Sequence, residues 1–394
     1  MLLKIISVVL LAMAATAHAR PYIPADDKQI VERLPSRNDP AQKDFQRLRK
    51  QLAQKPDDLA AASELAQKYI NEARNDGDPR YLGYAQAVLK PWWNLPQPPV
   101  PVLVLRATLL QSTHQFPAAL ADLNAVLKQD RDNAQAWLTR ATVQQVQGQY
   151  AQAKNSCMHL YALAPELITA TCLSNIGSLN GDADKSYAML VDAYKKNGNT
   201  DPGVSVWVMT LLAEMAVRRS DTAAAEQWYR QAMQLLPPDS YLLGSYADFL
   251  LDRKRAAEVI PLLKDKTRVD ALLLRYALAL QAVNAAEAST QREALGQRFA
   301  AAMMRGDTVH QREQARYELQ LKGNAAAALK LAQLNWEVQK EAADVRIYLE
   351  AAVAAGDIRA AAPVLAWIRQ TGLQDAALTP LVSRLSGLVQ GGAA

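Results

Sequence analysis

Residues 134–167 have the sequence AQAWLTRATVQQVQGQYAQAKNSCMHLYALAPEL, and five of their positions match in residue type the residues 34 positions earlier. The matched pairs are Leu103 with Trp137, Arg106 with Arg140, Ala107 with Ala141, Phe116 with Tyr150, and Ala119 with Ala153. Five matches at one fixed offset indicate a repeated structural unit, and a period of this length predicts a helical solenoid.

Each unit is expected to consist of two helices joined by a tight turn. Gly148 permits the turn because it has no Cβ, and Pro165 ends the second helix. Ala141 and Ala153 allow the two helices to cross at close range. One such unit cannot bury its apolar face alone, so neighbouring units must stack.

The spacing resembles the tetratricopeptide repeat, which has a large residue at position 4, a small one at 8, Gly at 15, an aromatic at 17, Ala at 20 and Pro at 32. Counted from Ala134, these positions hold Trp137, Ala141, Gly148, Tyr150, Ala153 and Pro165. The resemblance implies an all-α, right-handed superhelical solenoid of stacked antiparallel helix pairs. Residues 80–85, the Trp92-Trp93 segment and Asn335-Trp336 also make the whole chain similar to a group of uncharacterised exported bacterial tetratricopeptide proteins.

The chain begins with the pattern of an export signal. Lys4 supplies a positive charge, residues 5–13 form a short apolar core, and Ala17-His18-Ala19 is a small-x-small cleavage site. We predict a signal peptide over 1–19, cleavage near Ala19-Arg20 and a periplasmic mature protein; the alternative is an uncleaved N-terminal anchor. Residues 20–40 contain four prolines and no helical period, which predicts a flexible lead-in.

From residue 41 to 390 the sequence predicts the solenoid itself. The chain is 50% hydrophobic but only 6% aromatic, and its Ala and Leu content favours helix-on-helix packing. The clearest repeats are 100–133, 134–167, 206–239 and 240–264, the last with Asp252-Arg253-Lys254-Arg255 in place of the turn glycine. Residues 91–99 contain four prolines, so they are expected to form an inserted loop rather than a helix.

Two cysteines flank the boundary between two units. Cys157 lies eight residues before Pro165 and Cys172 lies seven after it, so in an antiparallel hairpin they stand opposite each other. In an oxidising compartment this placement predicts a disulfide. The alternative is a pair of small buried residues that never bond.

Catalytic patterns are scarce. His114, His159 and His310 are far apart, and the sequence has no metal-binding His or Cys spacing, phosphate loop or nucleophile elbow. We therefore predict a protein that is not an enzyme and needs no cofactor or metal. Arg312 and Arg316 share a helix face and form a possible anion site, although a solvated face with an internal ion pair is the alternative.

The charge balance is mild. The net charge of +5 becomes +4 when Lys4 leaves with the signal, and there is no basic run, so nucleic-acid binding is not expected. No stretch after the signal reaches the ~20 apolar residues of a transmembrane helix.

The resemblance also implies a binding surface. In this repeat the concave side is formed by positions 2, 5, 9 and 12 of each unit. The candidate groove residues are Thr108, Gln111, Gln135, Leu138, Thr142, Gln145, Trp207, Thr210, Glu214, Tyr241 and Asp248. The leading hypothesis is a protein-interaction scaffold of the bacterial cell envelope with an unidentified protein partner. The alternative is a subunit that binds glycan or peptidoglycan through Trp92 and Trp93; the oligomeric state stays open.

Overall fold

A computed structural model describes residues 26, 28, 40–197 and 200–391 of the chain. The predicted signal peptide, 1–19, lies outside these residues, as does the predicted lead-in apart from residues 26, 28 and 40. The chain divides into two compact units, 1–54 and 55–394. The first contains the amphipathic helix α2 (Pro40–Gln54), which buries Phe45 and Leu48 on one face.

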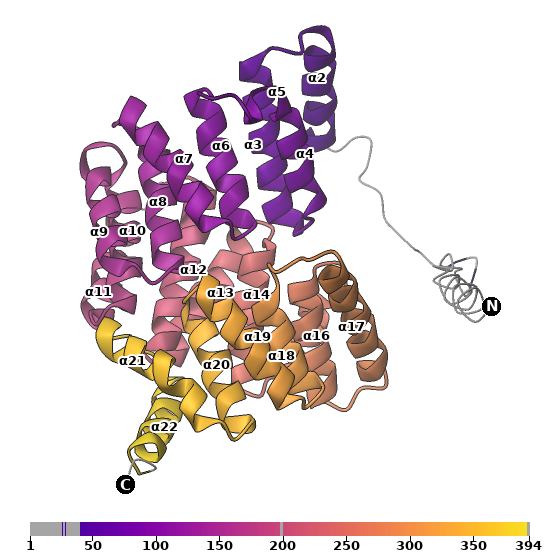
Figure 1. Cartoon of the computed structure of the whole chain (residues 1–394), viewed down its shortest axis with the longest axis vertical. Coiled ribbons are helices and arrows are strands. Elements are labelled where there is room, and N and C mark those ends of the chain that lie inside the picture. Colours follow the sequence, from indigo (N-terminus) through magenta and orange to yellow (C-terminus); the bar gives the residue numbers. More distant parts are fainter. Residues whose placement is uncertain (1–25, 27, 29–39, 198–199, 392–394) are drawn as a thin grey trace, which may run out of the picture. The chain divides into compact units, whose positions relative to one another are not determined.

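The second unit consists of consecutive helix pairs, and its described residues contain no strand (Figure 1). The early pairs are α3 (Leu59–Asp76) with α4 (Arg80–Val88), α6 (Val100–Ser112) with α7 (Phe116–Gln129), α8 (Ala134–Val146) with α9 (Tyr150–Met158) and η1 (His159–Ala162), and α10 (Glu166–Leu179) with α11 (Ala183–Lys196). The middle pairs are α12 (Pro202–Arg218) with α13 (Thr222–Leu235), α14 (Ser240–Asp252) with α15 (Ala256–Leu263), and α16 (Asp270–Ala282) with α17 (Ala288–Met304).

The last pairs are less regular. They are α18 (Gln311–Arg316) and the π-helical turn η2 (Tyr317–Leu321) with α19 (Ala325–Val338), then α20 (Ala342–Ala354) with η3 (Ile358–Ala361) and α21 (Ala362–Thr371). Helix α22 (Thr379–Gly391) follows them. Within the described part of the chain, no helix is both long enough and apolar enough to cross a membrane.

Alanines set the distance between the helices of each pair. Ala107 and Ala119 are fully buried between α6 and α7. Ala141 and Ala153 are buried at the equivalent positions of α8 and α9. A methyl side chain lets the two backbones approach, while Phe116 and Tyr150 fill the space beside the contact. The repeated spacing in the sequence is therefore the spacing of the core.

The turn within each pair needs one residue with positive φ. Gly148 has φ 72°, but the equivalent turns use His114 (φ 56°), Ser220 (φ 61°), Lys254 (φ 58°) and Asn284 (φ 54°). Lys254 is the residue of the 252–255 segment that takes the place of glycine. Side chains other than glycine adopt this conformation at a cost of about 1 kcal/mol, which the packing of the two helices outweighs.

The proline-rich segment differs from its prediction. A loop was expected over 91–99, but α5 (Lys90–Trp93) makes its first part helical. Pro91 lies in the first turn of this helix, where the missing N–H has no intrahelical partner to lose. The non-helical part of the insert begins only at Asn94.

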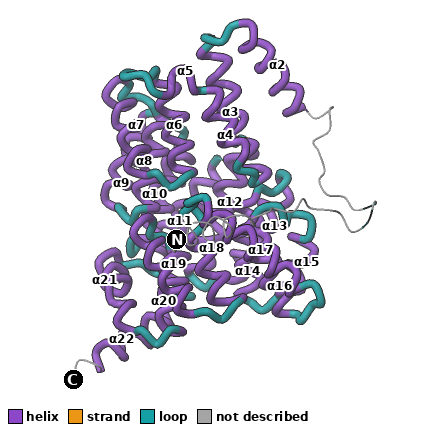
Figure 2. The backbone as a smooth tube through the Cα atoms, turned by 45° about the vertical axis from the view of Figure 1, so that its right-hand side comes forward, coloured by secondary structure: helices purple, strands orange, loops and turns teal. Residues whose placement is uncertain are grey.

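The last helices of the second unit return to its middle (Figure 2). The backbone N–H of Lys340 donates to the carbonyl of Val146 at 2.7 Å, and that of Ala376 donates to the carbonyl of Arg218 at 2.9 Å. One continuous apolar core contains buried side chains from α6 to α10 together with side chains from α18 to α22. The solenoid therefore closes on its own C-terminal helices.

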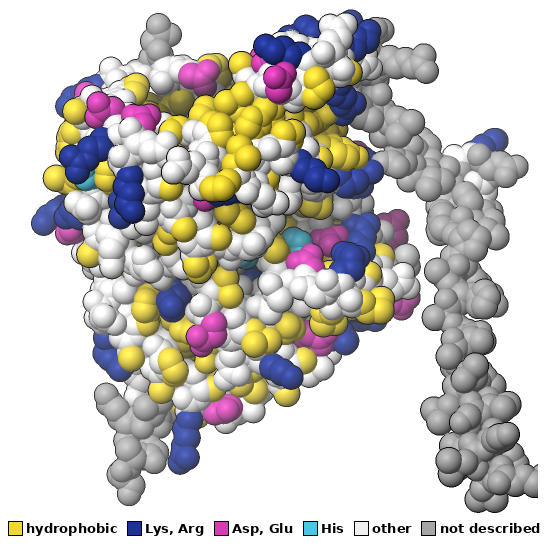
Figure 3. All heavy atoms as spheres, turned by 45° about the horizontal axis from the view of Figure 1, so that its top comes forward, with side chains coloured by type: hydrophobic (Ala, Val, Ile, Leu, Met, Phe, Trp, Pro, Cys, Tyr) yellow, Lys and Arg dark blue, Asp and Glu magenta, His cyan; other side chains and the backbone are white. Residues whose placement is uncertain are grey.

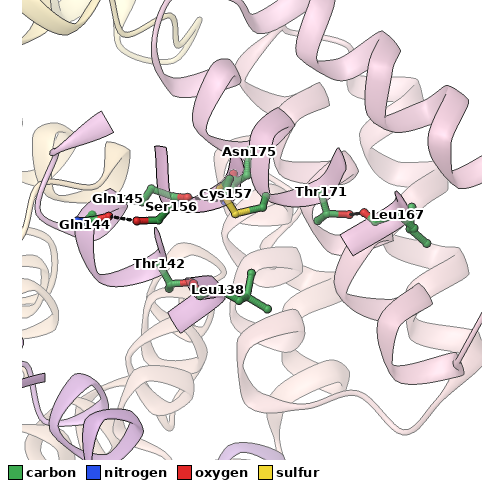
Figure 4. The surroundings of a disulfide bond; sticks show 10 residues. Leu138, Thr142, Gln144, Gln145, Ser156, Cys157, Leu167, Thr171 and Asn175 are labelled. Atoms are coloured by element: carbon green, nitrogen blue, oxygen red, sulfur yellow. Dashed lines mark hydrogen bonds between the residues drawn. A yellow bond between two sulfur atoms is a disulfide. The ribbon is translucent and has the colours of Figure 1, made fainter. Parts of the chain in front are cut away.

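Cys157 on α9 and Cys172 on α10 form a disulfide, with their Cα atoms 5.7 Å apart (Figure 4). Both cysteines are buried. Polar pairs surround the bond: Ser156 donates to Gln144 Oε1 at 2.7 Å, and the Thr171 hydroxyl donates to the Leu167 carbonyl at 2.6 Å. The bond joins two successive repeats, as the spacing of the cysteines predicts.

Removal of this bond should destabilise the unit. It closes a loop of 15 residues, so replacing both cysteines with Ala should lower the free energy of unfolding by about 3 kcal/mol. Urea denaturation measures the loss, and wild-type protein under reductant serves as the control because it should approach the variant. Alkylation of both thiols in the native protein without reductant would contradict the bond.

Gly148 tests the closure of the solenoid. A Cβ at this residue would lie 3.0 Å from the Trp367 ring of α21, whereas a Cβ at Gly356, with nearly the same φ, meets nothing within 4 Å. Gly356→Ala should therefore cost about 1 kcal/mol of stability, from the backbone alone. Gly148→Ala should cost about 2–3 kcal/mol, because it also displaces Trp367. Equal losses in urea denaturation would mean that α21 does not lie against this turn in solution.

Candidate functional site

The candidate groove residues lie on the first helices of their pairs: α6, α8, α12 and α14. Three of them are threonines whose hydroxyls are used within their own helix. Thr108, Thr142 and Thr210 donate to the carbonyl four residues earlier, at 3.0, 3.1 and 2.7 Å. These hydroxyls therefore offer a partner mainly their acceptor lone pairs.

Three further groove residues connect neighbouring repeats. Gln145 Oε1 accepts a hydrogen bond from the Asn175 side chain at 3.0 Å, and Glu214 Oε1 accepts one from the Ser245 hydroxyl at 2.9 Å. Asp248 forms an ion pair with an arginine of the next repeat, Arg275. These interactions fix the spacing of successive first helices.

The remaining groove residues differ in exposure. Gln135 is exposed and donates to Thr139 Oγ1 at 3.0 Å, whereas Gln111 is half-buried. Leu138 and Trp207 are half-buried and pack against the apolar cores. Tyr241 is 60% exposed, the most open aromatic side chain of the set.

The surroundings of Glu214 and Tyr241 raise the pKa of both side chains. Burial raises the pKa of the Glu214 carboxyl, against the lowering effect of Arg218. Loss of hydration at the phenol oxygen, and then the negative charge of Glu214, raises the pKa of Tyr241 above its usual range, although the residue as a whole is 60% exposed.

Arg312 and Arg316, predicted as a possible anion site, both contact carboxylates of this chain. Arg316 Nη1 lies 2.9 Å from Asp248 Oδ1 on α14. Arg312 Nη1 lies 2.9 Å from Glu341 Oε2 and 3.5 Å from Asp344 Oδ1. The arginines therefore connect α18 to α14 on one side and to α20 on the other.

Asp344 is the most buried carboxylate of this network. Its Oδ1 accepts from Asn335 at 2.8 Å and from Gln339 at 3.3 Å, and its Oδ2 accepts from the backbone N–H of Glu341 at 2.7 Å. Burial raises the pKa of Asp344 to about 6, although Arg312 acts in the opposite direction. The bond to Glu341 belongs to the capping box at the N-terminus of α20, and the bonds from Asn335 and Gln339 tie this cap to the end of α19; this is a structural role.

Trp92 and Trp93 are half-buried, and Trp93 packs on the neighbouring repeat. The Arg106 guanidinium lies 5.6 Å from the centre of the Trp93 ring and also donates to the Trp93 carbonyl. Arg106 is held in turn by Asp122 through two hydrogen bonds, at 2.6 and 2.7 Å. This arrangement fixes the insert onto α6 and removes one face of Trp93 from use as a stacking platform.

Two hollows open on the surface of the second unit. The first, of about 300 Å³, is lined by Ser63, Gln67, Val100, Pro101, Val104, Leu105, Asn133 and Gln135. It spans the first helices of three successive pairs and includes one predicted groove residue, Gln135. In Figure 3, apolar side chains gather in a patch on the face turned toward the viewer. Near the N-terminal end of this unit, Tyr84 on α4 and Leu95 in the insert are 47% and 44% exposed.

The second hollow, of about 430 Å³, lies between α17, η2 and α19. Sequence reasoning missed it, because its polar members Gln314 and Glu318 fit an ordinary amphipathic pattern. Met303 lines the hollow, and Met303 and Met304 are 58% and 83% exposed. The sequence alone does not distinguish such an exposed pair from buried methionines. No cluster of His, Cys, Asp and Glu among the described residues has the arrangement of a metal site.

Comparison with known proteins identifies solved structures of similar fold. No protein-family model matches the chain, and no curated protein matches it. The crystal structure of the APC/C hetero-tetramer Cut9–Hcn1 aligns with a TM-score of 0.53 at 12% identity, over 88% of this chain and 66% of that chain. The chain has a tetratricopeptide-like fold.

Two further structures align less well with this tetratricopeptide-like solenoid. A tetratricopeptide repeat protein from Parabacteroides merdae has a TM-score of 0.44 at 13% identity, over 60% of this chain and 91% of that chain. PilF from Pseudomonas aeruginosa has a TM-score of 0.33 at 15% identity, over 57% and 90%. The helices of the described residues and the Cut9–Hcn1 alignment confirm the predicted all-α solenoid, and that likeness concerns the fold alone.

The ion pair at Asp248 predicts a pH-dependent contribution to stability. Burial alone would raise the pKa of Asp248, but Arg275 and Arg316 lower it to about 2, below the usual 3.8. Its stabilising effect is therefore complete above about pH 4 and is lost as the pH falls through about 2.

Asp248→Asn should lower the free energy of unfolding by about 2 kcal/mol at pH 7, because it leaves two guanidinium groups without their carboxylate. The difference from wild type should shrink as the pH falls from about 4 toward about 2. Asp192→Asn is the control, since its pair with Lys196 is exposed and should matter little. A loss at Asp248 that did not change with pH would show that its charge is not the cause.

Proposed function

We propose that this protein is an exported, non-catalytic scaffold of the bacterial cell envelope, which holds a segment of a partner protein on the concave side of its first repeats. The tetratricopeptide-like fold supports an interaction role in general terms. In the Cut9–Hcn1 crystal structure, a chain of similar fold is part of a hetero-tetramer. The predicted signal peptide and the disulfide support export.

The first hollow is the observation that carries this proposal. Its lining combines apolar side chains of α6, Val104 and Leu105 among them, with the exposed amides of Gln67 and Gln135. Ser63 Oγ, at the same hollow, is buried and has no hydrogen-bond partner among the described residues. Apolar walls with a few polar groups suit an extended peptide, whose backbone needs donors and acceptors.

The later groove residues are less available to a partner. Asp248 is held by Arg275 and Arg316, and Glu214 is held by Ser245. The chain's own α18 thus contacts Asp248, one of the two groove positions on α14. A partner segment would therefore use the early repeats, with Gln135 as the central groove residue and Thr108 and Leu138 beside it.

Site-specific photo-crosslinking in cells tests the proposal. A benzoylphenylalanine at Gln67 or Gln135 should give one dominant crosslinked species with another envelope protein, because both side chains line the hollow. The same probe at Gln152, which is exposed on the second helix α9, should not give that species. Gel analysis followed by mass spectrometry identifies the products.

Several results would count against the proposal. The same species at Gln152, or no species at Gln67 and Gln135, would exclude this face as the binding surface. The mass of the chain from a periplasmic extract separates the question of export from that of binding. Export predicts a mature N-terminus at Arg20, whereas a mass that includes residues 1–19 in cytoplasmic extract alone would contradict it.

A further inference from the structure

The second hollow has the composition of a binding site. Its walls are apolar, formed by Phe299 and Met303 of α17 and by Leu331 and Leu334 of α19. It exists because α17 makes at most slight backbone contact with α18, whereas α7 packs along α8 in an earlier repeat. Tyr317 bridges the gap instead: its ring makes an edge contact with Phe299 and its hydroxyl approaches Gly296.

Two polar groups at this hollow are buried without partners. Gln314 is 4% exposed, and its Nε2 has no hydrogen-bond partner among the described residues. Glu318 Oε2 is also buried and unpartnered there, although Glu318 Oε1 lies 3.2 Å from Lys322 Nζ. A donor and an acceptor left unpaired in an otherwise apolar site cost stability. A ligand that supplies both partners would remove that cost.

The backbone at this point is irregular. The π-helical turn η2 carries Tyr317 and Glu318 and follows Gln314 by three residues. Turns of this type are rare and frequently occur at functional sites, because the extra residue redirects side chains. Here the turn places Glu318 and Lys322 at the edge of the same hollow.

The rim is positively charged and partly apolar. Lys322 and Lys330 are exposed lining residues, against the single carboxylate of Glu318. Met303 and Leu334 are 58% and 46% exposed on either side. Exposed apolar side chains beside lysines favour a ligand with an apolar group and a nearby negative charge.

We propose that this hollow binds a peptide segment of a partner protein through one large apolar side chain next to an acidic residue. The apolar side chain fills the space between α17 and α19. The backbone carbonyl of the segment accepts from Gln314 Nε2, and a backbone N–H donates to Glu318 Oε2. The acidic residue of the segment lies near Lys330.

This site is separate from the groove. The candidate groove residues lie on first helices of the pairs, whereas α17 and α19 are the second helices of two successive pairs. An experiment that disproves binding in the groove would therefore leave the proposed peptide site untouched, and the reverse also holds. A protein with both sites would hold two segments at once.

Selection of phage-displayed random 12-residue peptides on the full mature protein supplies the probe. Selected peptides, synthesised with a fluorescein label, should share a large apolar residue beside Asp or Glu. They should bind with a Kd below about 100 µM by fluorescence anisotropy. A selection that gives no such peptide overturns the proposal.

Matched variants locate the binding. Leu334→Glu should weaken the peptide at least about tenfold, because it places a charge in the apolar wall. Leu235→Glu, at a similarly exposed leucine of α13, should change the Kd less than about twofold. Lys330→Glu should weaken binding, whereas Lys128→Glu, at an exposed lysine of α7, should not. Equal effects within either pair overturn the assignment to this hollow.

Gln314→Leu separates a ligand-binding role from a structural one. It removes a buried donor that has no partner, so the thermal midpoint should be unchanged or higher. The peptide should nevertheless bind about fivefold more weakly, because its carbonyl loses a hydrogen bond. Unchanged affinity would show that Gln314 does not contact the peptide and would overturn the proposed backbone recognition.

Discussion

The close crossing of the two helices in each pair is the constraint on which the rest of the structure depends. Ala141 and Ala153 are buried at that crossing, as are Ala107 and Ala119 in the repeat before. A larger side chain at any of these residues would separate the helices and open the core beside the aromatic residue that follows the turn. Because the same crossing recurs in each repeat, a small rotation per repeat accumulates along the stack.

The accumulated curvature brings distant parts of the chain together. Arg316 reaches Asp248, and Arg346 reaches Asp252, 94 residues before it. The first of these contacts occupies Asp248, a position that the repeat pattern assigns to the groove. A groove position predicted from the repeat pattern is therefore not always available to a partner. The hollow on α3, α6 and α8 stays open, although α6 to α10 share a core with the C-terminal helices. On α14, in contrast, α18 contacts the groove position Asp248.

Local spacing in the sequence was sufficient to predict the solenoid and the disulfide. The Ala, Gly and Pro residues of 134–167 determine contacts within one hairpin. Cys157 and Cys172 lie at nearly equal distances in sequence from one turn. By contrast, the pairing of Arg316 with Asp248 depends on curvature summed over several repeats, which no local pattern contains. The prediction of a loop at Pro91 was wrong because proline is tolerated in the first turn of a helix.

The second hollow was equally inaccessible to pattern reasoning. It lies where α17 and α18 make at most slight backbone contact, which is a property of two neighbouring units and not of either sequence segment. Gln314 and Glu318 become unusual only when the surrounding side chains are seen to leave them unpaired. A buried amide without a hydrogen-bond partner can thus be recognised in the structure but not in the sequence.

The hydrogen bond from Lys340 to Val146 has an evolutionary consequence. An open solenoid can gain or lose a repeat at its end, because each repeat contacts only its neighbours. Here the helices near the C-terminus share a core with α6 to α10, so a repeat inserted between them would shift every contact across the interior. A closed solenoid therefore cannot gain or lose repeats as an open one can. Homologous chains should differ in their surface loops rather than in their number of repeats.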